Sequence, residues 1–212
     1  MIRREDTQLK PLIVWDVDDV LNNLTYEWFD EFETLNRTGI TYEKLSENPP
    51  DRLLGISRES YLESLDDFRM RRITSLKPVE ETMQWFIRHG NKFRHAALTA
   101  TPFRCAPASA QWVIKHYGNW IRTFHFVPSP RKDDQIVRYH ENKLELLSEI
   151  AEVSLFIDDS ETNLILAESA GINSLAFPRP WNRNRDLNLF EYLEKITLNN
   201  FAKNPAEHRA QP

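Results

Sequence analysis

Two aspartates follow an apolar run near the start of the chain, and their positions suggest a cation site. The run 12–15, LIVW, leads into Asp16 and Asp18, the pattern of a buried parallel strand with acids at its carboxyl end. In open α/β sheets, ligands bind in the crevice outside such strand ends. On a regular strand Asp16 and Asp18 would share one face. Two close carboxylates repel unless a cation or a proton lies between them, and oxygen ligands suit a hard cation, most simply Mg²⁺.

A second acidic strand end lies far downstream. The run 153–157, VSLFI, leads into Asp158 and Asp159. One such pair has little specificity, because aspartate is common where a strand turns into a loop. Two acid-tipped buried strands in one domain are a stronger signal. Together they predict that carboxylates converge on a metal ion.

Between the acidic strands, the chain offers a hydroxyl and an amine that suit a phosphate. A strand expected at 94–99 ends in Thr99, followed by Ala100, and Lys143 opens the helix that leads into the second acidic strand. Lys132 is a rival for the same role as Lys143. Taken singly, Thr99 reads as a strand residue and Lys143 as a surface lysine, so the order of the whole set carries the argument.

In that order the residues resemble the four motifs of the haloacid-dehalogenase (HAD) superfamily of phosphohydrolases, over about residues 10–195. The segment 16–21, DVDDVL, matches the first motif, Thr99 the second, Lys143 the third and the pair 158–159 the fourth. The resemblance implies an α/β, Rossmann-like core with a parallel sheet. It also implies a Mg²⁺-dependent phosphomonoesterase that acts on a small phosphorylated metabolite through an aspartyl-phosphate.

The resemblance also implies a role for each residue. Asp16 would be the nucleophile and Asp18 the general acid and base. Thr99, the Ala100 backbone N–H and Lys143 would bind the phosphoryl oxygens. The implied ligands of Mg²⁺ are the Asp16 carboxylate, the Asp18 backbone carbonyl, Asp158 and, through water, Asp159.

Within the superfamily, two segments resemble the 5′(3′)-deoxyribonucleotidase-like branch. They are 99–102, TATP, and 177–182, FPRPWN. This likeness implies a nucleoside monophosphate as substrate. Two residues depart from the pattern of that branch: Asp19 stands where it usually has glycine, and Ala100 replaces a serine.

Some aromatic and basic residues allow two interpretations each. Trp28 and Phe29 could stack on a base or pack a helix onto the core. The arginines at 179, 183 and 185, and those at 69, 71 and 72, could meet substrate anions or lie in water.

Alternating strand and helix patterns predict the elements that position these residues. We expect strands at about 12–16, 94–99, 123–127, 153–158 and 173–177, with helices at 24–36, 58–72, 79–89, 107–117, 142–151, 161–170 and 186–198. The stretch 24–76 is too long for an ordinary connection. It is therefore expected to be a small helical cap inserted after the first strand. Residues 1–23 and 77–198 would form the core domain, and 199–212 a flexible tail.

Composition limits the remaining possibilities. The chain has 212 residues and a net charge of −5, which argues against a partner that is an extended nucleic acid. One cysteine, and the lack of a signal-like apolar stretch or a membrane span, lead us to expect a cytoplasmic protein without membrane contact. The oligomeric state is left open. The alternatives to a phosphomonoesterase of nucleoside monophosphates are a phosphatase of a sugar phosphate or other small metabolite, and a non-catalytic HAD-fold binding protein.

Overall fold

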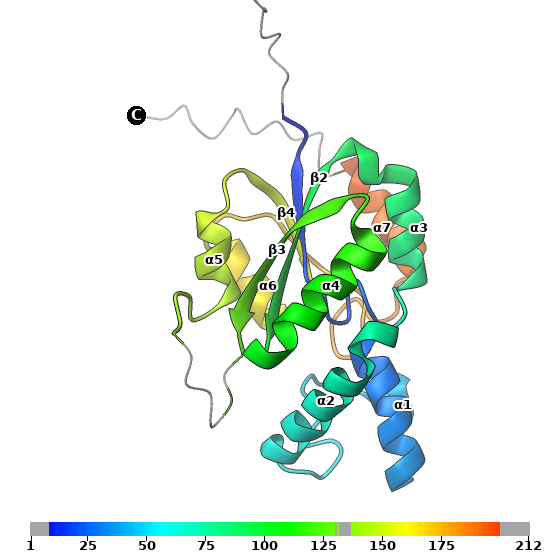
Figure 1. The fold of residues 1–212 in the computed structure, drawn as a ribbon. Coiled ribbons are helices and arrows are strands. Elements are labelled where there is room, and N and C mark those ends of the chain that lie inside the picture. The colour runs from blue at the N-terminus through cyan, green and yellow to red at the C-terminus, as the bar shows by residue number, and fades with distance from the viewer. Residues whose placement is uncertain (1–8, 130, 132–136, 200–212) are drawn as a thin grey trace, which may run out of the picture.

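A single parallel sheet forms the centre of the computed structural model, which describes residues 9–129, 131 and 137–199 (Figure 1). Its strands are β1 (Leu12–Trp15), β2 (Arg94–Thr101), β3 (Ile121–Pro128), β4 (Val153–Asp158) and β5 (Ser174–Ala176). The spatial order is β3-β2-β1-β4-β5, and every neighbouring pair is parallel. The expected α/β fold with a parallel sheet is confirmed. The first strand, which carries Asp16, lies in the middle.

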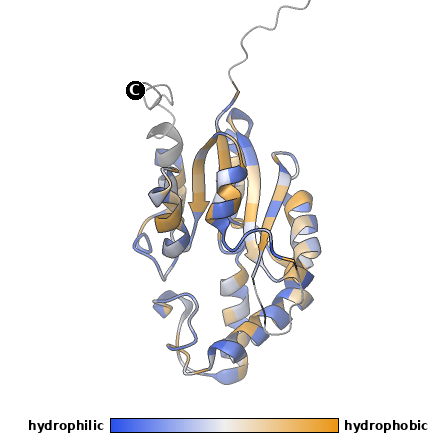
Figure 2. Ribbon diagram, turned by 90° about the vertical axis from the view of Figure 1, so that its left-hand side faces the viewer, coloured by the Kyte–Doolittle hydropathy of each residue, from blue (hydrophilic) through white to orange (hydrophobic). Residues whose placement is uncertain are grey.

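Helices cover both faces of the sheet. On one face lie α3 (Glu80–His89), α4 (Ala106–Tyr117) and α7 (Leu189–Asn199), and on the other α5 (Lys143–Glu149) and α6 (Glu161–Ser169). Side chains alternate along β1, so that Ile13 and Trp15 join the first apolar cluster and Leu12 and Val14 the second. Figure 2 shows the hydrophobic residues concentrated in the strands between these layers. No helix in the described ranges is long and apolar enough to cross a membrane.

The segment between β1 and α3 forms a separate lobe beyond the carboxyl ends of the strands (Figure 1). It contains α1 (Leu24–Asn36), which packs on α2 (Arg58–Arg72), and a short 3₁₀ turn at Tyr42–Lys44. The bounds of α1 agree with the prediction, and the short helices expected near 58–72 form one helix, α2. A helical cap at 24–76 remains a prediction as a domain division, and residues 200–212 of the predicted tail lie outside the described residues.

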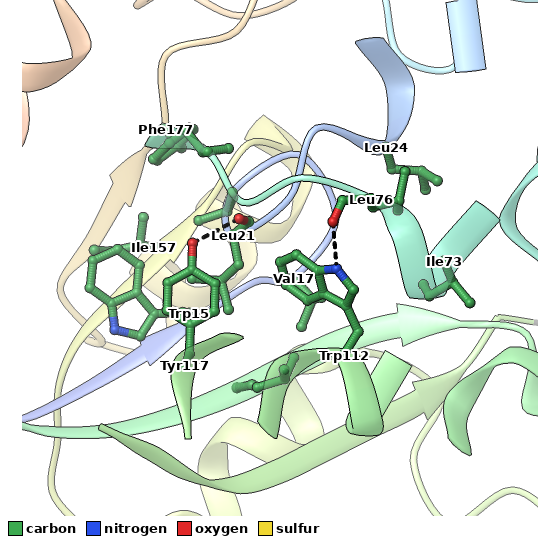
Figure 3. Close-up of a cluster of buried hydrophobic side chains, with 14 of the residues drawn as sticks. Trp15, Val17, Leu21, Leu24, Ile73, Leu76, Trp112, Tyr117, Ile157 and Phe177 are labelled. Carbon is green, nitrogen blue, oxygen red and sulfur yellow. Dashed lines mark hydrogen bonds between the residues drawn. The ribbon is translucent and has the colours of Figure 1, made fainter. Parts of the chain in front are cut away.

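Two aromatic side chains of α4 form hydrogen bonds with the two chain segments that connect the lobe to the sheet (Figure 3). Tyr117 donates its hydroxyl hydrogen to the Leu21 carbonyl at 2.9 Å, and the Trp112 indole donates to the Leu76 carbonyl at 2.8 Å. The two connections also pair with each other, since the Val79 N–H donates to the same Leu21 carbonyl at 2.9 Å. Both ends of the lobe are thus held on the core beside the end of β1.

The glycine that caps the C-terminus of α3 is set by packing rather than by its backbone conformation. Gly90 has φ −53°, which is not the left-handed conformation that requires glycine, and the chain continues into a 3₁₀ turn. A Cβ at Gly90 would lie 2.5 Å from Cδ1 of Trp120. The residue is therefore glycine because of close packing, whereas Gly171 after α6 has φ +76° and needs glycine for its backbone.

Candidate active site

Three buried carboxylates meet where β1 and β4 end. One oxygen from each of Asp16, Asp158 and Asp159 lies within 4.8 Å of the others. The sheet explains the meeting, because Trp15 pairs with Ile157 and the Asp16 N–H then donates to the Ile157 carbonyl at 2.9 Å. The predicted convergence of the two acidic strand ends is therefore present in the structure.

Lys143 lies inside this cluster rather than on the surface. Its Nζ is 2.7 Å from Oδ1 of Asp16 and 2.7 Å from Oδ2 of Asp158. Asn142 caps α5 by accepting the Glu145 N–H, which places Lys143 at the first position of the helix. Lys132, the alternative in the sequence, lies outside the described residues.

The negative charge of the cluster exceeds its positive charge. Among the described residues, one ammonium, that of Lys143, lies in the cluster, where it contacts Asp16 and Asp158 but is not paired with Asp159. Burial raises the pKa of Asp16 well above its ordinary value against the pull of Lys143. Burial, followed by the charge of Asp158, raises the pKa of Asp159 to about 7. Burial opposes the charge of Lys143, but Asp158 and Asp16 outweigh it and raise the pKa of the amine.

These features fit a divalent cation. The ligands are hard oxygen atoms, and ionised carboxylates at this separation need a further positive charge. Asp158 is already oriented, since it accepts hydrogen bonds from the Ser160 N–H at 2.8 Å and from Asn163 Nδ2 at 3.1 and 3.2 Å. The three buried acids are therefore a set of oxygen ligands that could hold a divalent cation.

Asp18 does not join the three acids, and the expectation that it shares a strand face with Asp16 is wrong. β1 ends at Trp15, and the chain then turns, with the Leu21 N–H bonded to the Val17 carbonyl. The Asp18 carboxylate instead accepts hydrogen bonds from Arg69 Nη2 and Asn22 Nδ2, each at 3.0 Å. Its side chain thus lies on the α2 side of the site.

The residues expected to bind phosphate lie at the end of the neighbouring strand. Ala97 of β2 pairs with Trp15 of β1, so Thr99 and Ala100 follow at the level where β1 has already ended. Thr99 is buried and Ala100 is exposed. Thr101, which sequence reasoning did not assign, has a buried hydroxyl that finds no hydrogen-bond partner among the residues that the structure describes.

Asp19 occupies the position where the nucleotidase-like branch usually has glycine. Its φ is 62°, in the left-handed region that aspartate tolerates better than most residues. Its carboxylate accepts the N–H of Thr25 at 2.9 Å and also the Thr25 hydroxyl. Burial raises the pKa of Asp19 to about 6, although Arg179 opposes the rise.

The segment 177–182, one of the two that resemble the nucleotidase-like branch, forms hydrogen bonds with Asp159 and Asp19. Trp181 Nε1 donates to Oδ2 of Asp159 at 2.8 Å, and Asn182 Nδ2 donates to the Asp159 carbonyl at 3.0 Å. Arg179 donates from Nε to the Asp19 carbonyl at 2.6 Å. These residues therefore support the acids from the last strand connection.

Besides Thr25, two further residues of the helical lobe contact acids of the site. Asn48 Nδ2 lies 3.4 Å from Oδ2 of Asp159, and Arg69 binds Asp18. Sequence reasoning missed Asn48, for which no local pattern gives a signal. It left Arg69 among several ambiguous arginines, of which Arg71, Arg72, Arg183 and Arg185 are exposed.

Trp28 and Phe29 pack within the lobe and offer no face to a base. Trp28 is 1% exposed, crosses the Tyr61 ring at 90° and donates its indole N–H to Ser64 Oγ at 3.0 Å. Phe29 is also buried, at 3% exposed. The stacking interpretation is wrong for both residues, and the packing interpretation is confirmed.

Comparison with known proteins supports the fold. No family model matches the sequence, and no curated protein matches it. Among solved structures, a hydrolase from Streptococcus pneumoniae TIGR4 is 18% identical and aligns with a TM-score of 0.50 over 80% of this chain and 94% of its own. The Mycobacterium tuberculosis Protein Tyrosine Kinase A is 12% identical and aligns with a TM-score of 0.55 over 80% of this chain and 84% of its own.

A haloacid dehalogenase-like hydrolase from Streptococcus pneumoniae is 12% identical and aligns with a TM-score of 0.47 over 79% of this chain and 84% of its own. At these identities the first two likenesses concern the fold. The chain thus has the α/β architecture that the motif order implied, and its activity must be argued from its own residues.

Proposed function

We propose that this chain is a Mg²⁺-dependent phosphomonoesterase in which Asp16 carries the phosphoryl group. The observation behind the proposal is the buried contact of Lys143 with both Asp16 and Asp158, beside Asp159, at adjacent ends of parallel strands. A nucleophilic carboxylate, a neighbouring cation and further acids for a metal are the parts that phosphoryl transfer to a carboxylate needs.

The proposed reaction has two steps. In the first, a carboxylate oxygen of Asp16 forms a bond to phosphorus, the bond to the leaving oxygen breaks, and Asp18 gives that oxygen a proton. In the second, water attacks the phosphorus of the aspartyl-phosphate, Asp18 takes the proton from the water, and the Asp16 carboxylate is released. Lys143 offsets the charge that develops beside Asp16.

Thr99 and Ala100 are proposed to bind the phosphoryl oxygens, through a hydroxyl and a backbone N–H. The support for this assignment is their place at the end of β2, the strand beside β1. The proposed Mg²⁺ ligands are Asp16, Asp158, Asp159 and the backbone carbonyl of Asp18. Bound Mg²⁺ would shield the nucleophile from the charge of the phosphate.

The substrate is proposed to be a small phosphorylated metabolite. Nucleoside monophosphates should be among the first substrates tested, because the segments 99–102 and 177–182 resemble the 5′(3′)-deoxyribonucleotidase-like branch. The burial of Trp28 removes one argument for a base. The contacts of Trp181 and Asn182 with Asp159 give that segment a supporting role in any phosphatase of this design.

Phosphate release from p-nitrophenyl phosphate, nucleoside monophosphates and sugar phosphates, with and without Mg²⁺, tests the proposal. Asp16→Asn is expected to lose at least about a thousandfold in kcat, the scale for loss of a nucleophile. Asp186→Asn, at a position 93% exposed, is the matched control and should keep full activity. Mg²⁺-dependent binding of phosphate esters without turnover would instead favour a non-catalytic binding protein.

A further inference from the structure

The hydrogen bonds around the three buried acids determine which of their oxygens a metal ion can reach. Both oxygens of Asp158 are engaged, Oδ1 by the Ser160 N–H at 2.8 Å and Oδ2 by Lys143 Nζ at 2.7 Å. Oδ1 of Asp16 accepts the Val17 N–H and Lys143 Nζ, each at 2.7 Å. A carboxylate oxygen has two lone pairs, so every such donor reduces what that oxygen can offer to a cation.

Asp159 has one oxygen whose two lone pairs are both met by uncharged donors. Its Oδ2 accepts Trp181 Nε1 at 2.8 Å and, more weakly, Asn48 Nδ2 at 3.4 Å. These two donors match the two lone pairs of that oxygen. Oδ1 is therefore the oxygen through which Asp159 can bind a metal ion, directly or through water.

Trp181 is held firmly against Asp159. Its neighbour Asn182 donates from Nδ2 to the Asp159 carbonyl at 3.0 Å and to the Phe177 carbonyl at 2.7 Å. The Tyr42 ring of the lobe meets the Trp181 ring nearly edge-on, with centroids 6.0 Å apart and planes at 84°. The indole N–H is thus fixed from the last strand connection and from the lobe. A donor fixed in this way keeps the carboxylate from turning.

The number of oxygens that a carboxylate can offer distinguishes Mg²⁺ from Ca²⁺. Mg²⁺ requires a regular octahedron of ligands and keeps several waters, so one oxygen from each carboxylate satisfies it. Ca²⁺ takes about six to eight oxygens at longer distances and often binds both oxygens of one carboxylate. A carboxylate with one oxygen locked therefore disfavours Ca²⁺ more than Mg²⁺.

We propose that Trp181 is a positioning residue that locks Oδ2 of Asp159, so that this acid offers one oxygen and the site favours Mg²⁺ relative to Ca²⁺. This inference rests on the metal site of the proposed function, and it assigns the selectivity of that site to a residue that is not itself a metal ligand. Loss of the indole N–H should therefore change the ratio of the two affinities, whereas loss of packing alone should not.

Calorimetric titration of the metal-free protein with magnesium chloride and with calcium chloride tests the inference without any turnover. Trp181→Phe keeps an aromatic ring but removes the N–H, which frees Oδ2 of Asp159. We expect Kd for Mg²⁺ to rise at least about tenfold, the scale for loss of a hydrogen bond to a metal ligand. Kd for Ca²⁺ should hardly change, because Ca²⁺ gains the second oxygen. The ratio of the Ca²⁺ Kd to the Mg²⁺ Kd should therefore fall by a similar factor.

Two further variants separate the N–H from packing and from folding. Trp120→Phe is the matched control, since Trp120 is half-buried, packs on Phe86 with ring centroids 5.4 Å apart and precedes β3 at the opposite end of the sheet from the acids. It should leave both Kd values unchanged. Asn48→Ala removes the weaker donor at an exposed position of the lobe. It should lower the same ratio by a smaller factor, and it decides the matter if Trp181→Phe does not fold.

The outcomes separate this inference from the proposed function. Equal changes in the two Kd values for Trp181→Phe, or the same shift of their ratio in Trp120→Phe, would overturn the inference. Hydrolysis of phosphate esters by the wild-type protein with Mg²⁺ would in that case leave the proposed function standing. If the wild-type protein binds neither ion, the metal site of the proposed function fails and the inference fails with it.

Discussion

The charged groups on the two sides of Asp18 are of opposite sign. On the sheet side three buried carboxylates lie together, and within the part of the chain that the structure describes one ammonium, that of Lys143, contacts two of them. On the α2 side, three guanidinium groups share Asp66, and one of them also binds Asp18. Buried charge needs compensation. Lys143 supplies part of it to the acids on the first side, and the Asp66 carboxylate supplies it to arginines on the second.

Removal of Lys143 is expected to have the largest effect on stability. Lys143→Met leaves the buried carboxylates of Asp16 and Asp158 without their ammonium, and loss of one partner of a buried ion pair costs about 3–5 kcal/mol. The free energy of unfolding, measured in urea without Mg²⁺, should fall by that amount. Lys115→Met, at an exposed lysine of α4, is the control. A loss equal to that of the control would show that the acids do not depend on Lys143.

Asp66→Asn is the corresponding experiment on the α2 side, because it removes the charge partner of the arginines there. It leaves the guanidinium groups without their shared carboxylate, but Arg104 can turn into water, so we expect a loss of about 3 kcal/mol, at the lower end of the range for buried pairs. Added inorganic phosphate should recover part of this loss, whereas Mg²⁺ should not. Recovery by Mg²⁺ would contradict the assignment of oppositely charged groups to the two sides.

Mg²⁺ should stabilise the wild-type protein through the acid cluster. A ligand present at a hundred times its dissociation constant adds about 2.7 kcal/mol to the free energy of unfolding, which a rise in Tm would report. Asp158→Asn removes a ligand and should abolish the rise, while Asp186→Asn should keep it. An unchanged Mg²⁺ response in Asp158→Asn would place the metal elsewhere.

The elevated pKa of Asp159 predicts how stability without metal depends on pH. An acid whose pKa is higher in the folded than in the unfolded protein favours folding when protonated. Its contribution is complete below the ordinary value of 3.8 and is lost as the pH rises through about 7. The wild-type protein should therefore lose stability, relative to Asp159→Asn, between about pH 4 and pH 7. Parallel pH profiles for the two proteins would exclude this effect.

The sequence predicted the parts of the site that depend on local patterns. An apolar run that ends in acids marks a buried strand and its carboxyl end, and β4 has the predicted bounds Val153–Asp158. The helix Leu24–Asn36 was predicted equally well from its apolar spacing. Neighbouring parallel strands then bring their ends together, which is why the meeting of Asp16 with Asp158 could be expected.

Other parts of the site depend on contacts between distant residues. The direction of the Asp18 side chain follows from a turn that begins immediately after β1, and strand alternation does not apply there. Arg69 lies 51 positions from Asp18, and Asn48 lies 111 positions from Asp159. Such contacts are set by how α2 and the preceding loop pack on the core, and no local residue pattern encodes them.

The central claim is that Asp16 itself carries the phosphoryl group. The p-nitrophenolate leaving group needs no proton, so Asp18→Asn should slow the hydrolysis of the aspartyl-phosphate much more than its formation. With p-nitrophenyl phosphate and Mg²⁺, rapid mixing of this variant should give a burst of p-nitrophenolate equal to the enzyme concentration. Acid quenching and peptide mapping should then find the phosphoryl group on Asp16. A phosphoryl group on another residue, or steady phosphate release without a burst, would contradict the account.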